Sequence, residues 1–171
     1  MKTALALLSI PFLLTSCAVT GKSIRDVPMI KSQNIQVSAL SGLPKRNVSL
    51  SVVDERDDKN QSAELRTEIT RAVTEALARE GTTVTTPGAN SLVLTIHNTE
   101  MGKFKEGCVK ITSNLVIPQK AKLGAEASSC FETNNPFGSK MSVDISKAYE
   151  EALSLIFKNL DQGLGQLNLK M

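Results

Sequence analysis

Residues 108–130 read CVKITSNLVIPQKAKLGAEASSC, and this stretch predicts a long β-hairpin. Polar and apolar residues alternate on both sides of a short turn at residues 118–120, which is typical of strands with one buried face. If Ile117 lies opposite Ala121, counting outward along both strands brings the two cysteines that end the stretch opposite each other. The hairpin pattern and the cysteine spacing therefore predict the same register.

This register also separates the hairpin into two faces. The apolar face comprises Val109, Ile111, Leu115, Ile117, Leu123, Ala125 and Ala127. The polar face comprises Lys110, Thr112, Asn114, Lys122 and Glu126, together with Cys108 and Cys130. Hairpin turns of three residues usually have a glycine in the left-handed conformation, and Pro118, Gln119 and Lys120 include none.

The sequence before the hairpin predicts two strands that enclose one helix. Residues 47–53 alternate as a half-buried strand does, and the alternation of leucine and isoleucine at 92–96 predicts another. A helix is expected to start with Ser62 as its N-cap and to end at Gly81. Its apolar stripe consists of Leu65, Ile69, Ala72, Val73, Ala76 and Leu77. A short β-branched run at 82–86 follows this helix and is counted as a further strand.

After the hairpin, a last helix is expected from about Ser142 to Gly163. Its apolar stripe consists of Ile145, Tyr149, Ala152, Ile156 and Leu160, widened by Leu155 and Phe157. The order of elements is thus β-α-β-β-β-β-α. It predicts an α+β fold, with two helices packed on one face of a mainly antiparallel sheet of four to five strands.

The N-terminus predicts an exported lipoprotein. A charged start, an apolar run from Ala4 to Leu14 and small residues before Cys17 form a secretory signal with a bacterial lipobox. A transmembrane helix is the alternative, but the run has about eleven residues and a span needs roughly 20. Residues 1–16 are therefore expected to be a signal peptide that is removed.

In the bacterial lipoproteins that this N-terminus resembles, the cysteine thiol carries lipid, and the resemblance implies the same for Cys17. Two or three acyl chains such as palmitate would anchor the chain stably. Ala18 follows the cysteine where an aspartate would favour retention in the inner membrane, so the periplasmic face of the outer membrane is expected. Residues 17–46 are interpreted as the lipidated cysteine and a tether, in which Ile30–Leu40 could add an edge strand, and 47–165 as one domain.

Export bears on the other two cysteines, because thiols in an oxidising compartment tend to pair. Cys108 and Cys130 are therefore predicted to form a disulfide, with two buried free thiols as the alternative.

The composition of the chain limits the classes of ligand that it is expected to bind. The 171 residues carry a formal net charge of +3 with both signs interspersed, which is not typical of nucleic-acid binding.

Three local features were candidates for a site. The charged run at residues 54–58 lacks the alternating ligands of a calcium loop, so a solvated turn with Asp54 paired to Arg56 is expected. His97 is the only histidine and is expected at the surface, on the face opposite Leu92, Leu94 and Ile96. Lys103, Lys105 and Lys110 could contact anionic headgroups, but they are scattered as ordinary surface charge is.

Several of these features together resemble the YajG-like outer-membrane lipoproteins, a family of unknown molecular function. They are the lipobox, the V-x-D-x-R pattern of Val52, Asp54 and Arg56, Gly81 after the first helix, the strand at 92–96 and the final helix. The resemblance covers roughly residues 47–163 and implies an α+β fold. The cysteine pair is not a hallmark of that family, and no functional residue is carried over from it.

Neither a catalytic residue, a cofactor nor a metal site is expected. The leading hypothesis is a non-catalytic accessory or assembly lipoprotein that binds another envelope protein while Cys17 holds it to the membrane. A carrier of an envelope lipid or glycan is the alternative. A hydrolase using His97 as base is a third possibility, but no G-x-S-x-G pattern is present. The oligomeric state is left open.

Overall fold

The computed structural model describes residues 27–37, 40, 42–43, 45–56, 62–97, 100–101, 106–132 and 139–168. The predicted signal peptide, Cys17, Lys103 and Lys105 lie outside these residues. The elements, in chain order, are η1 (Ser32–Asn34), β1 (Asn47–Asp54), α1 (Ser62–Arg79), β2 (Thr83–Val84), β3 (Asn90–Ile96), β4 (Glu100–Met101), β5 (Glu106–Ile117), β6 (Ala121–Glu132) and α2 (Ser139–Asn168).

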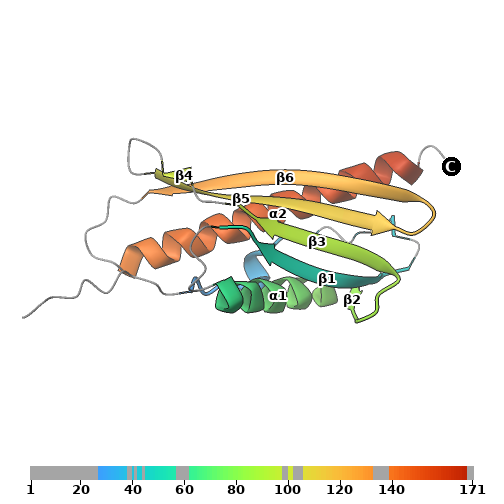
Figure 1. The fold of residues 1–171 in the computed structure, drawn as a ribbon, viewed down its shortest axis with the longest axis horizontal. Coiled ribbons are helices and arrows are strands. Elements are labelled where there is room, and N and C mark those ends of the chain that lie inside the picture. The colour runs from blue at the N-terminus through green and yellow to red at the C-terminus, as the bar shows by residue number, and fades with distance from the viewer. Residues whose placement is uncertain are drawn as a thin grey trace, which may run out of the picture.

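The strands form one mixed sheet with β6 along one edge and the two-residue β2 at the other (Figure 1). From β2 the order runs through β1 and β3 to β5, which pairs with β6 on its far side and with the short β4 beside the end of β3. The pairs that include β5 are antiparallel, whereas β1 runs parallel to both β2 and β3. The predicted α+β fold is confirmed, and so is its order of elements apart from the two-residue β4, which was not predicted.

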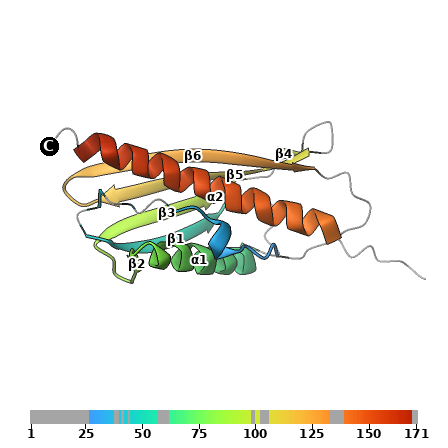
Figure 2. The same cartoon turned by 180° about the vertical axis from the view of Figure 1, so that it is seen from behind.

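Both helices cover the same face of this sheet (Figure 2). α1 packs against β1 and β2, and α2 packs against β5 and β6. Between the two layers lies one apolar core, to which the sheet contributes Leu92, Leu94, Ile96, Ile111 and Leu115, each no more than 1% exposed. The alternation seen in the sequence therefore divides the sheet into an inner face and an outer face.

α1 has the apolar stripe that its sequence predicts, and all six residues of that stripe are buried. Ser62 is the first residue of the helix and not its cap, and its side chain hydrogen-bonds Asp54. At the other end Gly81 has a φ of 79°, and the N–H of Thr82 donates to the carbonyl of Leu77 at 2.9 Å. This is the Schellman arrangement that a C-terminal glycine permits.

The hairpin has the predicted register, with Ile117 opposite Ala121 and Cys108 opposite Cys130. Gln119 takes the left-handed position that a glycine usually fills, with a φ of 61°. The turn is closed by the N–H of Lys120, which donates to the carbonyl of Ile117 at 3.1 Å.

The parallel pairing of β1 and β3 was not predicted. It requires a crossover between the two strands, and α1 provides it. The chain then turns back to β3 through Gly88, which passes so close to β1 that a Cβ there would overlap the backbone nitrogen of Ser49.

The described residues between 27 and 43 belong to the folded domain, although they were predicted to be part of a tether. Ile30, Ile35 and Leu40 are fully buried in the core, and Val37 and Leu43 are nearly so. The segment contains the single turn η1 and forms no strand among its described residues, so the prediction of an edge strand at Ile30–Leu40 was wrong. The folded body begins before residue 47 because these apolar side chains belong to the core. The backbone of η1 lies between α1 and α2 (Figure 2).

Side chains of α1 hold the backbone of this segment from one side. Glu68 accepts a hydrogen bond from the N–H of Ile30 at 2.8 Å, and Arg71 donates to the carbonyl of Ile30 at 2.8 Å. The hydrogen bond from Arg71 to Glu68 keeps the pKa of Glu68 below its ordinary value despite its partial burial. Arg79 donates to the carbonyls of Ser32 and Ile35 at 3.0 and 2.8 Å.

α2 holds the same backbone from the other side. The N–H of Lys31 donates to Glu150 at 2.8 Å, as does the side-chain amide of Asn34, and the N–H of Gln36 donates to the Ser154 hydroxyl at 2.9 Å. Glu150 is 5% exposed. A buried carboxylate needs such donors. They explain why Glu150 can be buried although it is not part of the apolar stripe of α2.

α2 is longer than predicted at both ends and continues past Gly163 to Asn168. Gly163 faces Leu123 of β6, so this glycine allows helix and strand to approach closely and does not end the helix. Leu155, predicted to widen the apolar face, is 41% exposed, whereas Leu153 and Leu164 are buried.

The segment at residues 27–37 is expected to contribute to stability as the core does. Ile35→Ala should lower the free energy of unfolding by about 2 to 5 kcal/mol, because it leaves a cavity at a fully buried site. Met29→Ala is the control, because Met29 is 74% exposed and its loss should change stability by about 0.5 kcal/mol or less. Urea unfolding measures both, and equal small effects would contradict the placement of this segment.

Candidate interaction surface

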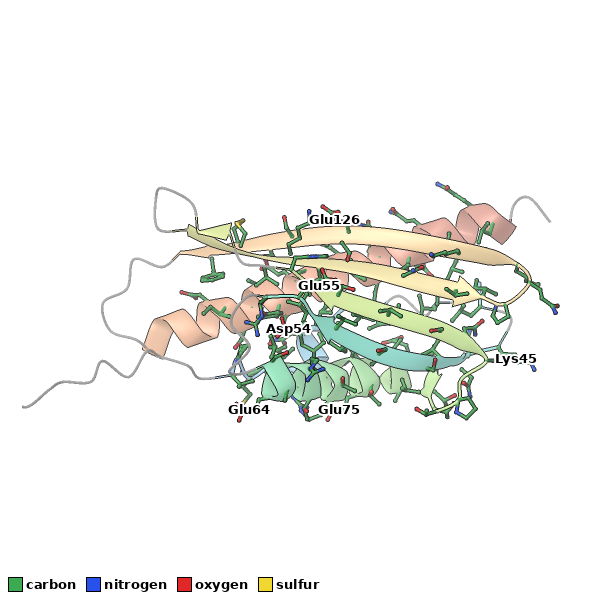
Figure 3. All side chains as sticks on the ribbon, viewed as in Figure 1. Lys45, Asp54, Glu55, Glu64, Glu75 and Glu126 are labelled. Carbon is green, nitrogen blue, oxygen red and sulfur yellow. A yellow bond between two sulfur atoms is a disulfide. The ribbon has the colours of Figure 1, made fainter. Side chains whose placement is uncertain are left out.

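The outer face of the sheet is the side without helices, and it carries most of the residues that the sequence singled out. Lys110, Thr112, Asn114, Lys122 and Glu126 lie on it, as predicted, with the cysteine pair. Their inward neighbours along the same strands are in the core. Figure 3 shows Glu126 on β6 and Glu55 beyond the end of β1.

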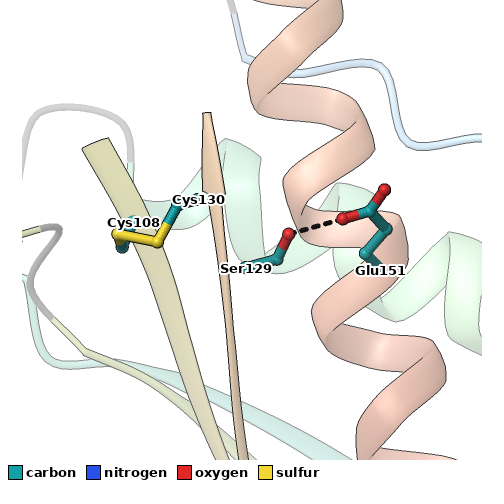
Figure 4. Close-up of a disulfide and its surroundings, with 4 residues drawn as sticks. All are labelled: Cys108, Ser129, Cys130 and Glu151. Atoms are coloured by element: carbon teal, nitrogen blue, oxygen red, sulfur yellow. Dashed lines mark hydrogen bonds between the residues drawn. A yellow bond between two sulfur atoms is a disulfide. The ribbon is translucent and has the colours of Figure 1, made fainter. Parts of the chain in front are cut away.

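Cys108 and Cys130 form a disulfide with an S–S distance of 2.06 Å (Figure 4). The Cα atoms are 3.9 Å apart, and the bond links β5 to β6 near the end of the hairpin that lies away from its turn. The neighbouring Ser129 points to the opposite face, where its hydroxyl donates to Glu151 of α2 at 2.7 Å. The predicted pairing is therefore present, and it lies on the outer face.

An ion pair crosses the hairpin on the same face. Lys110 Nζ lies 2.8 Å from Glu126 Oε1, and the two side chains are 45% and 61% exposed. The hydrogen bond from Lys110 keeps the pKa of Glu126 below its ordinary value. Because both groups remain in contact with water, the pair adds little to stability and leaves charge on the surface.

His97 lies at the surface, as expected, between groups from two other strands. Its Nε2 lies 2.8 Å from Thr112 Oγ1 on β5, and its Nδ1 lies 3.2 Å from Oε2 of Glu55, which follows β1. The imidazole itself follows β3. These contacts connect three strands at one end of the sheet.

Asp54 and Arg56 pair locally, as the charged run predicted. Arg56 Nε and Nη2 donate to the two carboxylate oxygens of Asp54, both at 2.8 Å, and the Asp54 side chain is fully buried. Burial opposes ionisation of Asp54, but the hydrogen bonds from Arg56 outweigh it and lower its pKa. Tyr149 of α2 lies close enough for these charges to act on it, and burial raises its pKa to about 12.

The outer face also contains a hollow of about 580 Å³. It lies across β3, β5 and β6 and is lined by Val93, Thr95, Thr112, Ser113, Asn114, Lys122 and Gly124. The Oδ1 atom of Asn114 is buried and accepts no hydrogen bond from the described residues. Because this atom has almost no exposed surface, a partner in the hollow would contact the exposed part of the Asn114 side chain and not this atom.

Sequence reasoning missed this hollow, because it joins residues of three strands. Two further hollows open at the surface: one of about 510 Å³ between η1 and α2, and one of about 540 Å³ beside β1 and α1. Within the described parts of the chain, no three His, Cys, Asp or Glu side chains gather closely enough to hold a metal ion. Neither described helix is both long and apolar enough to cross a membrane.

No protein-family model matches the chain, and no curated protein matches it either. Solved structures with a similar fold include protein XCC0632 from Xanthomonas campestris, of the DUF330 family. That match has 9% identity and a TM-score of 0.46, and it covers 72% of this chain and 87% of the other.

Two other solved structures are also similar. PelC from Paraburkholderia phytofirmans, solved as a dodecamer, has 13% identity and a TM-score of 0.40, over 67% of this chain and 89% of its own. Lipoprotein GNA1162 from Neisseria meningitidis has 13% identity and a TM-score of 0.36, over 61% and 94%. Matches this distant identify neither a family nor a function, so membership of the YajG-like family stays a prediction.

The Asp54–Arg56 pair generates a prediction about stability. Arg56→Met should lower the free energy of unfolding at pH 7 by about 2 to 4 kcal/mol, because it leaves a buried carboxylate without its cation. The double variant Asp54→Asn, Arg56→Met should lose less, because it also removes the charge. Urea unfolding measures all three proteins.

The pH dependence of stability should differ between the natural protein and Arg56→Met. In the natural protein the lowered pKa of Asp54 stabilises the fold above about pH 4, and this contribution is lost as the pH falls through the folded pKa. In Arg56→Met the side-chain hydrogen bonds and the charge of Arg56 are lost, and burial is opposed only by the backbone N–H of residue 56 and by Ser62. The pKa of Asp54 is therefore expected to be higher than in the natural protein, so that protonation costs this variant less stability. The stability difference between the two proteins should therefore shrink from pH 7 to pH 3, and a constant difference would contradict this explanation.

Proposed function

We propose that this chain is an exported lipoprotein, anchored through lipid on Cys17, whose domain faces the periplasm from the outer membrane. The lipobox at residues 14–17 supports the anchor. The Cys108–Cys130 disulfide supports export, because such bonds persist in oxidising compartments. Ala18 supports the outer over the inner membrane.

In that setting the domain acts as a non-catalytic accessory factor that binds another envelope protein through the outer face. The observation that carries this function is the hollow across β3, β5 and β6, whose lining includes Thr95, Thr112 and Asn114. Lys110 and Glu126 beside it present charges of both signs. A partner with polar groups at its centre and charged groups around them fits such a surface.

Carriage of a lipid between helices and sheet is the weaker alternative. The side chains that line that space, such as Leu65, Leu92 and Phe157, are packed in the core with essentially no exposed surface. The hollow on the outer face is lined by threonines and an asparagine, which suit a protein or a glycan better than an acyl chain.

The anchor is tested by Cys17→Ala. The natural protein should incorporate labelled palmitate and partition with outer membranes, whereas the variant should incorporate none and leave the membrane fraction. Ala18→Asp is the matched control, because it keeps the lipid and should move the protein to the inner membrane. Equal membrane association of Cys17→Ala and the natural protein would contradict lipid anchoring.

Partner binding is tested in intact cells with a photo-crosslinking residue at Thr95, inside the hollow. It should give an adduct with one recurrent envelope protein. The same residue at Glu75, a half-exposed position of α1, is the control and should give none. The same products from both positions, or no adduct from Thr95, would argue against the outer face as the binding surface.

A further inference from the structure

β6 is a long edge strand. Its 12 residues pair with β5 on one side, and no other described strand pairs with it on the other. The opposite edge of the sheet is β2, which has two residues and is followed by Pro87. An edge of this length exposes a row of backbone donors and acceptors, which is a site for addition of another strand.

The direction of these backbone groups follows from the ladder. The N–H of His97, which follows β3, donates to the carbonyl of Lys110, so the even-numbered residues of β5 direct their polar groups toward β3. The residues opposite them on β6 must then point their N–H and C=O groups away from β5. They include Lys122, Gly124 and Glu126.

A contact with α2 agrees with this direction. The carbonyl of Glu126 accepts a hydrogen bond from the side-chain amide of Asn159 at 3.3 Å, which it could not do if it pointed toward β5. That carbonyl has a second lone pair and can accept another bond. The outward groups at Lys122 and Gly124 form no hydrogen bond with another element among the described residues.

We propose that this edge pairs with β6 of a second copy of the chain, antiparallel, with Gly124 opposite Gly124 of the other copy. In that register Lys122 of each copy lies opposite Glu126 of the other. Both side chains are exposed on the outer face, so two cross-strand ion pairs form around a two-fold axis. Gly124 has no side chain, so the two glycines at the axis leave room for both ion pairs.

The charges favour this register over those centred on Lys122 or on Glu126. Pairing centred on Lys122 would set two ammonium groups opposite each other, and pairing centred on Glu126 would set two carboxylates opposite each other. Like charges in directly opposed positions are destabilising. A second copy is therefore preferred to an arbitrary strand, because it supplies the matching charge at both positions.

The inner face of the same edge agrees with the register. Leu123 would lie opposite Ala125 of the other copy, and both are apolar and only partly buried in the single chain. On α2, which covers β6, Leu155 is 41% exposed and lies one turn from Asn159, the residue that reaches the edge. Addition of a second sheet would shield these side chains from water.

The test uses the full chain in detergent, as an equal mixture of natural and ¹⁵N-labelled protein, treated with a carbodiimide that joins amines to carboxylates in contact. A mixed-isotope link between Lys122 and Glu126 is expected. The link between Lys110 and Glu126 of one copy is the internal control, because those atoms lie 2.8 Å apart. Abundant control link with no mixed-isotope link between Lys122 and Glu126 overturns the proposal.

Charge variants test the register by light scattering of the same detergent-solubilised chain. Lys122→Glu and Glu126→Lys should each weaken self-association about tenfold, because each turns two attractive pairs into repulsive ones. The double variant should restore it, and Lys45→Glu, an equal charge change just before β1 and so separated from β6 by β3 and β5, should leave it unchanged. Failure of the double variant to recover association, or a strand of a different protein on β6, also overturns the proposal.

Discussion

The fold depends on how the irregular segment at residues 27–37 satisfies its backbone. A buried segment without a strand partner would leave its N–H and C=O groups unpaired, at a cost that few small domains tolerate. Here side chains replace a strand: Glu68 and Arg79 of α1 reach it from one side, and Glu150 of α2 reaches it from the other. The same segment inserts Ile30 and Ile35 between the helices, so it joins α1 and α2 into one layer. The helices can then share one face of the sheet, and neither of them covers the opposite face.

Local patterns were enough to predict the parts of the fold that neighbouring residues build. The β5–β6 hairpin follows from period-two alternation around one turn, and the disulfide follows from its register. The end of α1 follows from Gly81, because a left-handed residue after a helix favours glycine. Asp54 and Arg56, two residues apart, were expected to pair and do so.

The other features of the fold and of the candidate site depend on contacts between distant segments. The periodicity of a sequence does not reveal such contacts. Ile30 and Ile35 lie in a segment that was interpreted as a possible edge strand, whereas their burial results from the space that α1 and α2 leave. The parallel pairing of β1 with β3 requires that α1 cross over the sheet first. Gly163 looked like a helix end, but it allows α2 to pass Leu123 closely. The hollow at Asn114 was not predicted for the same reason, because β3, β5 and β6 line it together.

The β5–β6 hairpin is joined at both ends, by its turn and by the Cys108–Cys130 bond, and thus forms a covalent ring that cannot change register. Contacts inside such a ring are close along the chain and form quickly, whereas the β1–β3 ladder and the burial of Ile30 must first close long loops. We therefore expect folding to start in the C-terminal half and to bury the N-terminal segment last. A chain emerges in the opposite direction, with its N-terminus first. We thus expect Ile30 and Ile35 to stay exposed to water until nearly the whole chain has emerged, and a chaperone that accompanies the protein to bind this segment first.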